Sequence, residues 1–324
     1  MNMNASAGLQ RDDDQPLIFA GSASRALGAE IAEYLKLPLG RSEVLRFSEG
    51  NVFVRVLENV RGRHVYLVQG TVFPANDQFM ELLFWIDALK RASAASVTAI
   101  VPYFSYAKGD KKDEPRVSIR ARVCADAIQA AGVDRIVTMD LHAPQVQGFF
   151  RVPVDDLYAL PVLCEAVEGK AFPDLVVVAP DAGFAKKARK FSTRLRAPFA
   201  LADKQRVDHR EQVEILSIMG EVEGRTALLV DDFVISGSTL IQAAAALKER
   251  GAAAVCAAVT HGVFTGPCLE ILDASPIDLL FVTNTVEPQV PRLSAKVERV
   301  SVAPLFGEAI RRIHQRESIS VLFD

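Results

Sequence analysis

Two adjacent carboxylates and a run of small hydroxyl-bearing residues stand together in the segment Val-Asp-Asp-Phe-Val-Ile-Ser-Gly-Ser-Thr, residues 230–239. Asp231 and Asp232 can accept hydrogen bonds from sugar hydroxyls or help to bind a divalent cation. Glycine lets the backbone approach a phosphate closely and the hydroxyls add donors, which suits the second half of the segment: Ser236, Gly237, Ser238 and Thr239. The segment therefore predicts a sugar-phosphate site, and ribose 5-phosphate fits both halves.

The residues on either side of this segment predict the elements that position it. The apolar run 226–230 has the character of a buried strand, and the alanine-rich stretch 240–250 has the character of a helix. A loop that joins them would lie at the carboxyl edge of a sheet, with free N–H groups at the start of the helix. Such a helix N-terminus attracts anions, which supports the assignment of phosphate to this end.

Short apolar runs alternate with helical patterns along the chain, which predicts an α/β fold built on mainly parallel sheets flanked by helices. In residues 76–91, apolar side chains recur at helical spacing. The predicted strands are residues 17–20, 65–69, 97–101, 135–139, 175–179, 227–230, 253–259 and 279–283.

Eight such strands, in a plan that runs twice along the chain, predict two domains. The best boundary is the turn-rich stretch 152–161, which contains two prolines and two aspartates. The polar residues 1–15 are expected to form a disordered leader. We therefore predict an N-terminal domain over residues 16–155 and a C-terminal domain over residues 156–302.

Composition excludes several classes of protein. Of the 324 residues, half are hydrophobic, which is ample for two cores. The 37 basic and 40 acidic residues are well mixed, so no broad basic face for nucleic acid is expected. No apolar stretch approaches the roughly 20 residues that span a membrane, and no secretion signal precedes the fold. We expect a cytoplasmic protein with four reduced cysteines and neither nucleic acid nor membrane as partner.

The decapeptide 230–239 resembles the phosphoribosyl-pyrophosphate (PRPP) binding motif of phosphoribosyltransferases and PRPP synthetases. A second segment separates the two: residues 140–150, Asp-Leu-His-Ala-Pro-Gln-Val-Gln-Gly-Phe-Phe, resemble the metal-binding segment of the ribose-phosphate pyrophosphokinase family. The resemblance then extends from about Leu17 to Asp324. It implies two phosphoribosyltransferase-like domains, with residues 303–324 returning to the first. It also implies transfer of a diphosphoryl group from ATP to ribose 5-phosphate, which gives PRPP and AMP.

The same resemblance implies roles for individual residues. His142 and Asp181 stand at the positions of metal ligands, and the implied cofactor is Mg²⁺. Lys204 and Arg206 stand in the family's flexible catalytic loop, whose cations reach the transferring group when the loop closes. Composition alone leaves a solvated charged loop equally open for these two residues.

ATP would be bound by two further segments. Phe47, Glu49 and Asn51 stand in a loop that reaches the nucleotide of a neighbouring subunit, which implies a homo-oligomer, with the family's hexamer among the forms open to it. Lys108 and Asp110 stand in the other ATP segment. No GxxxxGK[ST] loop is present, so ATP is not expected to be bound in the Walker manner.

Three departures from the family pattern fall inside the site. Ile235 stands where an acidic residue is usual, and its side chain cannot accept a hydrogen bond from the sugar. Lys108 replaces an arginine, and a lysine cannot make the bidentate contact of a guanidinium. Phe184 replaces a glycine in the turn expected to close over pyrophosphate. These changes leave three hypotheses open: an active synthetase, a non-catalytic or regulatory homologue, and a related transferase that acts on another phosphosugar.

Overall fold

The computed structural model describes residues 15–206, 213–288 and 292–323. For residues 203–206 and 213–216 it describes the backbone alone. The leader predicted over residues 1–15 therefore lies outside the described residues, apart from Gln15.

The first sheet has five parallel strands in the order β1-β4-β5-β6-β7. Each central strand is an apolar run with buried side chains on both faces, as expected for a sheet covered by helices on both sides. The strands are β1 (Leu17–Ala20), β4 (His64–Val68), β5 (Ser96–Val101), β6 (Arg135–Met139) and β7 (Val154–Leu157).

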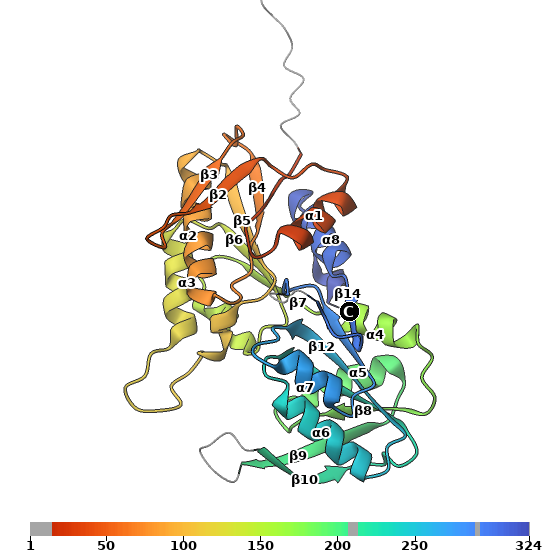
Figure 1. The fold of residues 1–324 in the computed structure, drawn as a ribbon. Coiled ribbons are helices and arrows are strands. Elements are labelled where there is room, and N and C mark those ends of the chain that lie inside the picture. The colour runs from red at the N-terminus through yellow and green to blue at the C-terminus, as the bar shows by residue number, and fades with distance from the viewer. Residues whose placement is uncertain (1–14, 207–212, 289–291, 324) are drawn as a thin grey trace, which may run out of the picture.

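Helices cover both faces of this sheet, and a hairpin lies beside it (Figure 1). One face carries α2 (Ala75–Arg91) and α3 (Arg120–Ala130), and the other carries α1 (Arg25–Leu35) and α8 (Ala303–His314). Helix α8 thus brings the C-terminal part of the chain back to the N-terminal sheet. It packs closely on α1, because a Cβ at Gly307 would lie only 2.4 Å from the Tyr34 ring. The antiparallel hairpin consists of β2 (Ser42–Arg46) and β3 (Val52–Val56).

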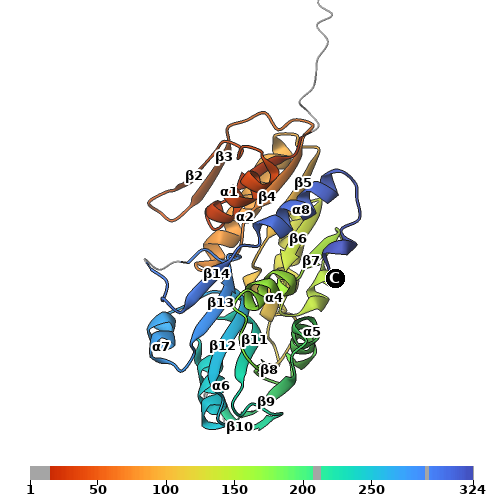
Figure 2. The same cartoon turned by 90° about the vertical axis from the view of Figure 1, so that its right-hand side faces the viewer.

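The second sheet has seven strands in the order β10-β9-β8-β11-β12-β13-β14, and only the β9–β10 pair is antiparallel. It lies below the first sheet in Figures 1 and 2. Its strands are β8 (Leu175–Ala179), β9 (Phe199–Arg206), β10 (Val213–Met219), β11 (Thr226–Val234), β12 (Ala254–Gly262), β13 (Leu279–Thr283) and β14 (Val297–Val300).

Four helices flank the second sheet. Their apolar residues enter two separate cores, one on each face of the sheet. Helices α4 (Leu160–Glu168) and α5 (Ala185–Leu195) cover one face, and α6 (Ser238–Glu249) and α7 (Cys268–Ala274) cover the other. Three short 3₁₀ helices complete the described elements: η2 (Ser105–Lys108), η3 (Pro144–Phe149) and η4 (Ser320–Leu322).

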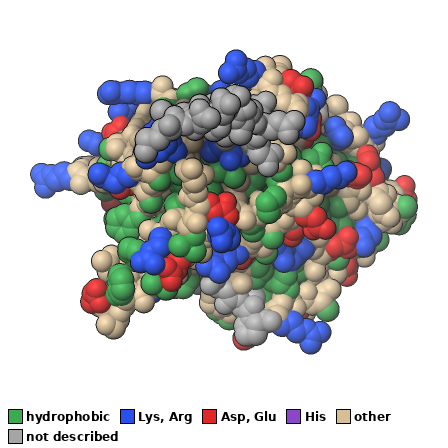
Figure 3. All heavy atoms as spheres, turned by 90° about the horizontal axis from the view of Figure 1, so that it is seen from above, with side chains coloured by type: hydrophobic (Ala, Val, Ile, Leu, Met, Phe, Trp, Pro, Cys, Tyr) green, Lys and Arg blue, Asp and Glu red, His purple; other side chains and the backbone are tan. Residues whose placement is uncertain are grey.

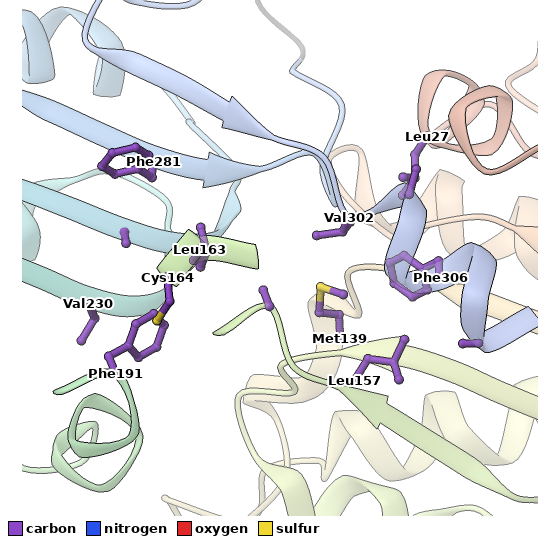
Figure 4. Packing of buried hydrophobic residues seen from close by; sticks show 14 of the residues in the cluster. Leu27, Met139, Leu157, Leu163, Cys164, Phe191, Val230, Phe281, Val302 and Phe306 are labelled. Atoms are coloured by element: carbon purple, nitrogen blue, oxygen red, sulfur yellow. The ribbon is translucent and has the colours of Figure 1, made fainter. Parts of the chain in front are cut away.

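One hydrophobic core is continuous across the two sheets. It contains Leu27 of α1 and Phe306 of α8 on the side of the first sheet, and Phe191 and Phe281 on the side of the second. Met139, at the end of β6, lies between these groups (Figure 4). Burial of apolar side chains from both halves in one core fixes the sheets relative to each other.

Two parts of the sequence-based prediction need correction. The turn-rich stretch 152–161 contains the edge strand β7, so the boundary predicted between residues 155 and 156 falls inside a strand. Pro153 precedes this strand and Pro161 lies in the first turn of α4, two positions where a missing N–H is tolerated. Strand β11 also continues to Val234, so Asp231 and Asp232 lie in a strand and not in the loop after it.

The charged side chains, the cysteines and the helices can each be examined in the structure. Where described side chains are visible in Figure 3, basic and acidic groups are interspersed on that face. All four cysteines are buried and unbridged. In the part of the chain that the structure describes, no helix is both long and apolar enough to cross a membrane.

Candidate active site

Loops from both sheets meet where strands of each sheet end. The pocket at this place is lined from the first sheet by η2 and by the residues after β6, and from the second sheet by the ends of β11 and β12. The carboxyl edge of parallel strands is the usual position of a ligand site in α/β proteins. The lining residues are Tyr103, Phe104, Ser105, Ala107, Lys108, Met139, Asp140, Leu141, His142, Phe233 and His261.

His142 and Asp232 face each other across the two sheets. The Nδ1 atom of His142 lies 2.8 Å from Oδ2 of Asp232, whose side chain is buried. Burial raises the pKa of Asp232, but the hydrogen bond with His142 and the nearby positive charge of Lys187 outweigh it and hold the pKa below the usual value. An ionised Asp232 can only accept, so Nδ1 carries a proton, and in the neutral ring Nε2 has the free lone pair. This is the arrangement of a histidine oriented for a metal.

The pKa of Asp231 is shifted in the opposite direction to that of Asp232. Burial and the charge of Asp232 raise the pKa of Asp231 well above the usual value, and Asp181 adds to the effect. The pKa values of the two carboxyls are therefore pushed apart, that of Asp231 upward and that of Asp232 downward. A cation or a set of sugar hydroxyls placed beside them would stabilise the second negative charge.

The segment predicted to bind phosphate lies at the start of α6. Gly237 precedes the helix with a φ of 80°, a conformation that few residues other than glycine adopt. The hydroxyls of Ser236 and Ser238 lie 3.1 Å apart, and Ser236 and Ser238 are both exposed. A helix N-terminus with two adjacent hydroxyls has the donors that a phosphate needs. Ser236, Gly237, Ser238 and Thr239 lie between β11 and the first turn of α6, and their role in phosphate binding stays a prediction.

Asp181 follows β8 and precedes α5, as the sequence predicted. Its Oδ1 atom accepts a hydrogen bond of 3.0 Å from the backbone N–H of Phe184. The Phe184 side chain is buried in the core shared by the two sheets. Among the described residues, no group of three or more His, Cys, Asp or Glu side chains could together hold a metal ion.

Lys108 lines the pocket, whereas Asp110, two residues later, is not among the lining residues. The Lys108 ammonium is 3.6 Å from the centroid of the Phe233 ring. Asp110 accepts a hydrogen bond of 2.5 Å from Gln145, which links the segment after η2 to η3. The predicted ATP segment is thus tied to the segment that carries His142.

Three of the remaining predicted residues, on the β2–β3 hairpin, do not line this pocket. Phe47, Glu49 and Asn51 lie at the tip of the β2–β3 hairpin, beside the first sheet and away from the second in both views (Figures 1 and 2). Phe47 is 45% exposed. Lys204 and Arg206, expected in a loop, have strand backbone at the end of β9, paired with Ile215 and Val213 of β10. Their side chains, and residues 207–212 of the expected loop, lie outside what the structure describes.

Several residues of the site were not predicted. Lys187 donates a hydrogen bond of 3.3 Å to the carbonyl of Leu141, next to His142. Asp140 has a φ of 44° and accepts hydrogen bonds from Ala159 N–H and from the Thr260 hydroxyl, which joins the two sheets. In the sequence, Lys187 stands out only as one of several lysines in a basic helix, six residues after Asp181. The fold is needed to show which of these lysines points toward the site.

His261 forms a further link between the sheets. Its Nε2 atom lies 3.1 Å from the Met139 carbonyl, and its Nδ1 atom lies 2.8 Å from the Thr285 hydroxyl. Burial lowers the pKa of His261, so the ring is neutral, with its proton on Nε2 and donated to the carbonyl. This bond fixes the end of β6 immediately before the segment that carries Asp140 and His142.

Asp156 is a buried acid behind this segment. One oxygen accepts from the Leu141 N–H, and the other has no hydrogen-bond partner among the described residues. Burial raises the pKa of Asp156 from 3.8 to about 7. The folded chain therefore binds this proton more tightly than the unfolded chain, and the free energy of unfolding falls as the pH rises from about 4 to about 7.

We expect Asp156→Asn to remove this dependence. The amide replaces a protonated carboxyl of the same shape, so the variant should match the wild type at pH 4 and be more stable by about 2 to 4 kcal/mol at pH 8. Urea unfolding at both pH values measures the difference. The control is Asp155→Asn, on the same strand as Asp156, which breaks the 2.5 Å ion pair with Arg135 of β6 and should give no gain at either pH. Equal stability of Asp156→Asn and wild type at pH 8 would refute a protonated Asp156.

Comparisons with known proteins agree with this geometry. The N-terminal domain of ribose phosphate pyrophosphokinase matches residues 16–132, and the phosphoribosyl synthetase-associated domain matches residues 207–324. A ribose-phosphate pyrophosphokinase of Caldanaerobacter subterraneus is 47% identical over 94% of this chain and 97% of its own length. One from Rhizobium meliloti is 45% identical over 95% of this chain and 99% of its own length.

The fold agrees as well. The crystal structure of phosphoribosylpyrophosphate synthetase from Mycobacterium smegmatis superposes with a TM-score of 0.87 and 36% identity, and the match covers 93% of this chain and 99% of that one. The predicted α/β architecture of mainly parallel sheets flanked by helices is therefore confirmed. Likeness at this level, along nearly the whole length of both chains, shows that the chain belongs to the ribose-phosphate pyrophosphokinase family.

Proposed function

We propose that this protein is a ribose-phosphate diphosphokinase, which transfers the diphosphoryl group of ATP to the C1 hydroxyl of ribose 5-phosphate and releases AMP. One observation carries the proposal beyond family membership. The strand that bears Asp231 and Asp232 leads into the N-terminus of α6, and its Asp232 holds His142 of the opposite sheet at 2.8 Å. The Asp232 carboxylate thus belongs to the segment proposed to bind the sugar phosphate and also accepts a hydrogen bond from a candidate metal ligand.

Ribose 5-phosphate can be placed from the chemistry of this edge. Its phosphate suits the N–H groups and hydroxyls of Ser236, Gly237, Ser238 and Thr239. Its ring hydroxyls then lie toward Asp231 and Asp232, which can accept hydrogen bonds from them. This orientation directs the C1 hydroxyl away from α6 and toward the pocket that contains Lys108 and His142.

The donor set is compatible with Mg²⁺. Magnesium commonly takes one or two carboxylates from a protein and completes its octahedron with water and substrate phosphates, so no cluster of three protein ligands is needed. Asp181 would supply an oxygen, and the free Nε2 of His142 would supply a second position. When bound with ATP, the ion would neutralise charge on the phosphate oxygens.

In the reaction the C1 oxygen attacks the β-phosphorus of ATP. A bond forms between that oxygen and the β-phosphorus, the bond from the β-phosphorus to the oxygen bridging it to the α-phosphate breaks, AMP leaves with that oxygen, and the hydroxyl proton passes to water. We propose that Lys204 and Arg206 approach the diphosphoryl group and stabilise the charge that develops on its oxygens. Lys108 and Asp110 would hold ATP from the η2 side.

The position of the hairpin supports a homo-oligomer. Phe47, Glu49 and Asn51 lie away from the pocket of their own chain, so they can contact ATP only in the site of another copy. The exposed Phe47 ring is suited to packing against a base. We propose that ATP and ribose 5-phosphate are the small-molecule partners, that a second copy of this chain completes the nucleotide site, and that the protein acts in nucleotide biosynthesis in the cytoplasm.

The activity is tested by incubating the purified protein with ATP, magnesium and ribose 5-phosphate and by measuring AMP over time. The expected result is AMP formation that depends on both magnesium and the sugar phosphate. A chain that forms no AMP with any phosphosugar, but raises the activity of a co-expressed synthetase, would instead be a regulatory homologue.

Ile235 lies between the acid pair and the phosphate loop, and it is the residue of this loop that fits a sugar least well. Its backbone carbonyl accepts a hydrogen bond of 3.0 Å from Thr265, so a new side chain can be introduced without changing this backbone contact. If ribose 5-phosphate is the substrate, Ile235→Asp should maintain or raise activity, because a carboxylate can accept from the sugar hydroxyls.

Rates of the wild type and Ile235→Asp on ribose 5-phosphate and on its 2-deoxy analogue decide the sugar preference. Ile235→Asn serves as a control for polarity without charge. An aspartate that lowers activity on ribose 5-phosphate by about 1 to 3 kcal/mol, with the wild type preferring the deoxy sugar, would show a pocket adapted to a less polar substrate.

A further inference from the structure

Phe233 is the aromatic residue between the acid pair and the phosphate loop. Its side chain is half-buried and lines the pocket, and its backbone pairs with His261 of β12. One neighbour is the Lys108 ammonium, 3.6 Å from the ring centroid. Another is the His142 ring, whose centroid is 5.3 Å away at an interplanar angle of 57°. The ring of Phe233 therefore contacts one predicted ATP residue and one predicted metal ligand.

The surroundings of Lys108 explain why such a contact matters. Burial lowers the pKa of Lys108, while the negative charges of Asp232 and Asp231 oppose this effect. These carboxylates attract the ammonium, yet within the described part of the chain no carboxylate forms an ion pair with it. A lysine stem has several rotatable bonds, so the ring face also limits the freedom that the ammonium would otherwise have.

We propose that Phe233 is a positioning residue for ATP, which holds the Lys108 ammonium above its ring and away from Asp231 and Asp232. An ammonium drawn onto the acid pair would neutralise the groups that receive the sugar and would leave the ATP phosphates without their cation. Packing against the His142 ring places the cation and the candidate metal ligand at a fixed separation. This inference rests on the proposed function, because it takes Lys108 to bind ATP.

The Phe233 ring has a rigid support because Phe233 lies on a paired strand. Strand β11 pairs with β12 on both sides of this residue, up to Val234 and Gly262. His142 is itself held by Asp232, the residue that precedes Phe233. Lys108, in contrast, belongs to the short 3₁₀ helix η2. The Phe233 ring is held by a paired strand, so it restricts the motion of the Lys108 side chain, which extends from a less regular segment.

The test compares Phe233→Leu with Phe233→Tyr. Leucine keeps an apolar side chain but has no π face, and tyrosine keeps the ring. We expect Phe233→Leu to raise the KM for ATP about tenfold, the factor expected for a partly desolvated cation–π contact. The KM for ribose 5-phosphate should stay within about twofold, and Phe233→Tyr should restore the KM for ATP.

A double-mutant cycle with Lys108→Met shows whether Phe233 acts through Lys108. We expect Phe233→Leu to have no further effect on the KM for ATP in the Lys108→Met background. Phe199→Leu is the matched control, because the Arg189 guanidinium lies 4.4 Å from that ring, outside the pocket, and this change should leave the KM for ATP unaltered. Melting temperatures of all variants separate a loss of stability from a loss of positioning.

Three results would overturn the proposal. The KM for ATP in Phe233→Leu could equal that of the wild type, the effect could persist undiminished in Lys108→Met, or Phe199→Leu could produce the same rise. Calorimetric binding of ATP with magnesium separates failure of this inference from failure of the proposed function. If the wild type formed no AMP, an equal Kd for ATP in wild type and Phe233→Leu would still refute the role of Phe233, and a tenfold weaker Kd in the variant would still support it.

Discussion

Lys204→Ala is expected to lower kcat about a hundredfold or more while changing the KM for ribose 5-phosphate by less than about threefold. A cation that meets the diphosphoryl group only as the reaction proceeds stabilises charge in the transition state and adds little to ground-state binding. Loss of one such interaction typically costs about 3 kcal/mol. The ground for this expectation is the position of Lys204 in the family pattern, at the end of strand β9.

Steady-state rates at saturating ATP, with ribose 5-phosphate varied, give kcat and KM separately. Gln205→Ala, the next residue of β9, is the matched control and should retain activity within about twofold. Lys204→Arg tests whether charge alone is sufficient. A kcat for Lys204→Ala equal to that of the wild type would remove this residue from catalysis.

Asp232→Asn is expected to lower kcat/KM about a hundredfold and to raise the magnesium concentration required for half-maximal activity. The wild-type carboxylate accepts from Nδ1 of His142 at 2.8 Å, which leaves Nε2 free for a metal. An amide carries no charge and can donate as well as accept, so the imidazole is no longer held in one tautomer. Loss of an outer partner of this kind typically costs about ten- to a hundredfold in metal affinity or activity.

Magnesium titrations of activity test this expectation. Asp126→Asn is the control, because Asp126 lies on α3 and forms an exposed ion pair with Arg122 at 2.9 Å. Its rate and metal dependence should equal those of the wild type. If Asp232→Asn kept both the wild-type rate and the wild-type magnesium dependence, the link between His142 and Asp232 would have no part in metal binding.

The sequence predicted most of the framework because periodicity and end signals act locally. Buried parallel strands such as β8 and β11 are apolar runs in the sequence, and the amphipathic helix α2 is visible from its spacing. The acid pair lies near the carboxyl end of β11 and the hydroxyl loop follows this strand directly, so their place at the carboxyl edge could be predicted from the order of elements. Family membership, inferred from residues 140–150 and 230–239, is confirmed.

The missed features depend on contacts between distant parts of the chain. Strand β7 contains two aspartates between prolines, and only its pairing with β6 makes it a strand. The polar end of β11 is extended because β12 pairs with it. Phe233 lies over 100 residues from Lys108 in the sequence, and local patterns carry no information about which lysine will meet its ring. The roles given to the predicted site residues stay predictions.

The fate of the two terminal phosphates of ATP tests the central claim most directly. Phosphorus NMR of a reaction with ATP, magnesium and ribose 5-phosphate distinguishes a diphosphate bound to C1 of the sugar from free phosphate, free pyrophosphate and ADP. We predict that AMP and the sugar C1-diphosphate form in equal amounts, with ribose 5-phosphate consumed at the same rate. Formation of ADP with a singly phosphorylated product, or release of free pyrophosphate without a C1-diphosphate, would contradict the account.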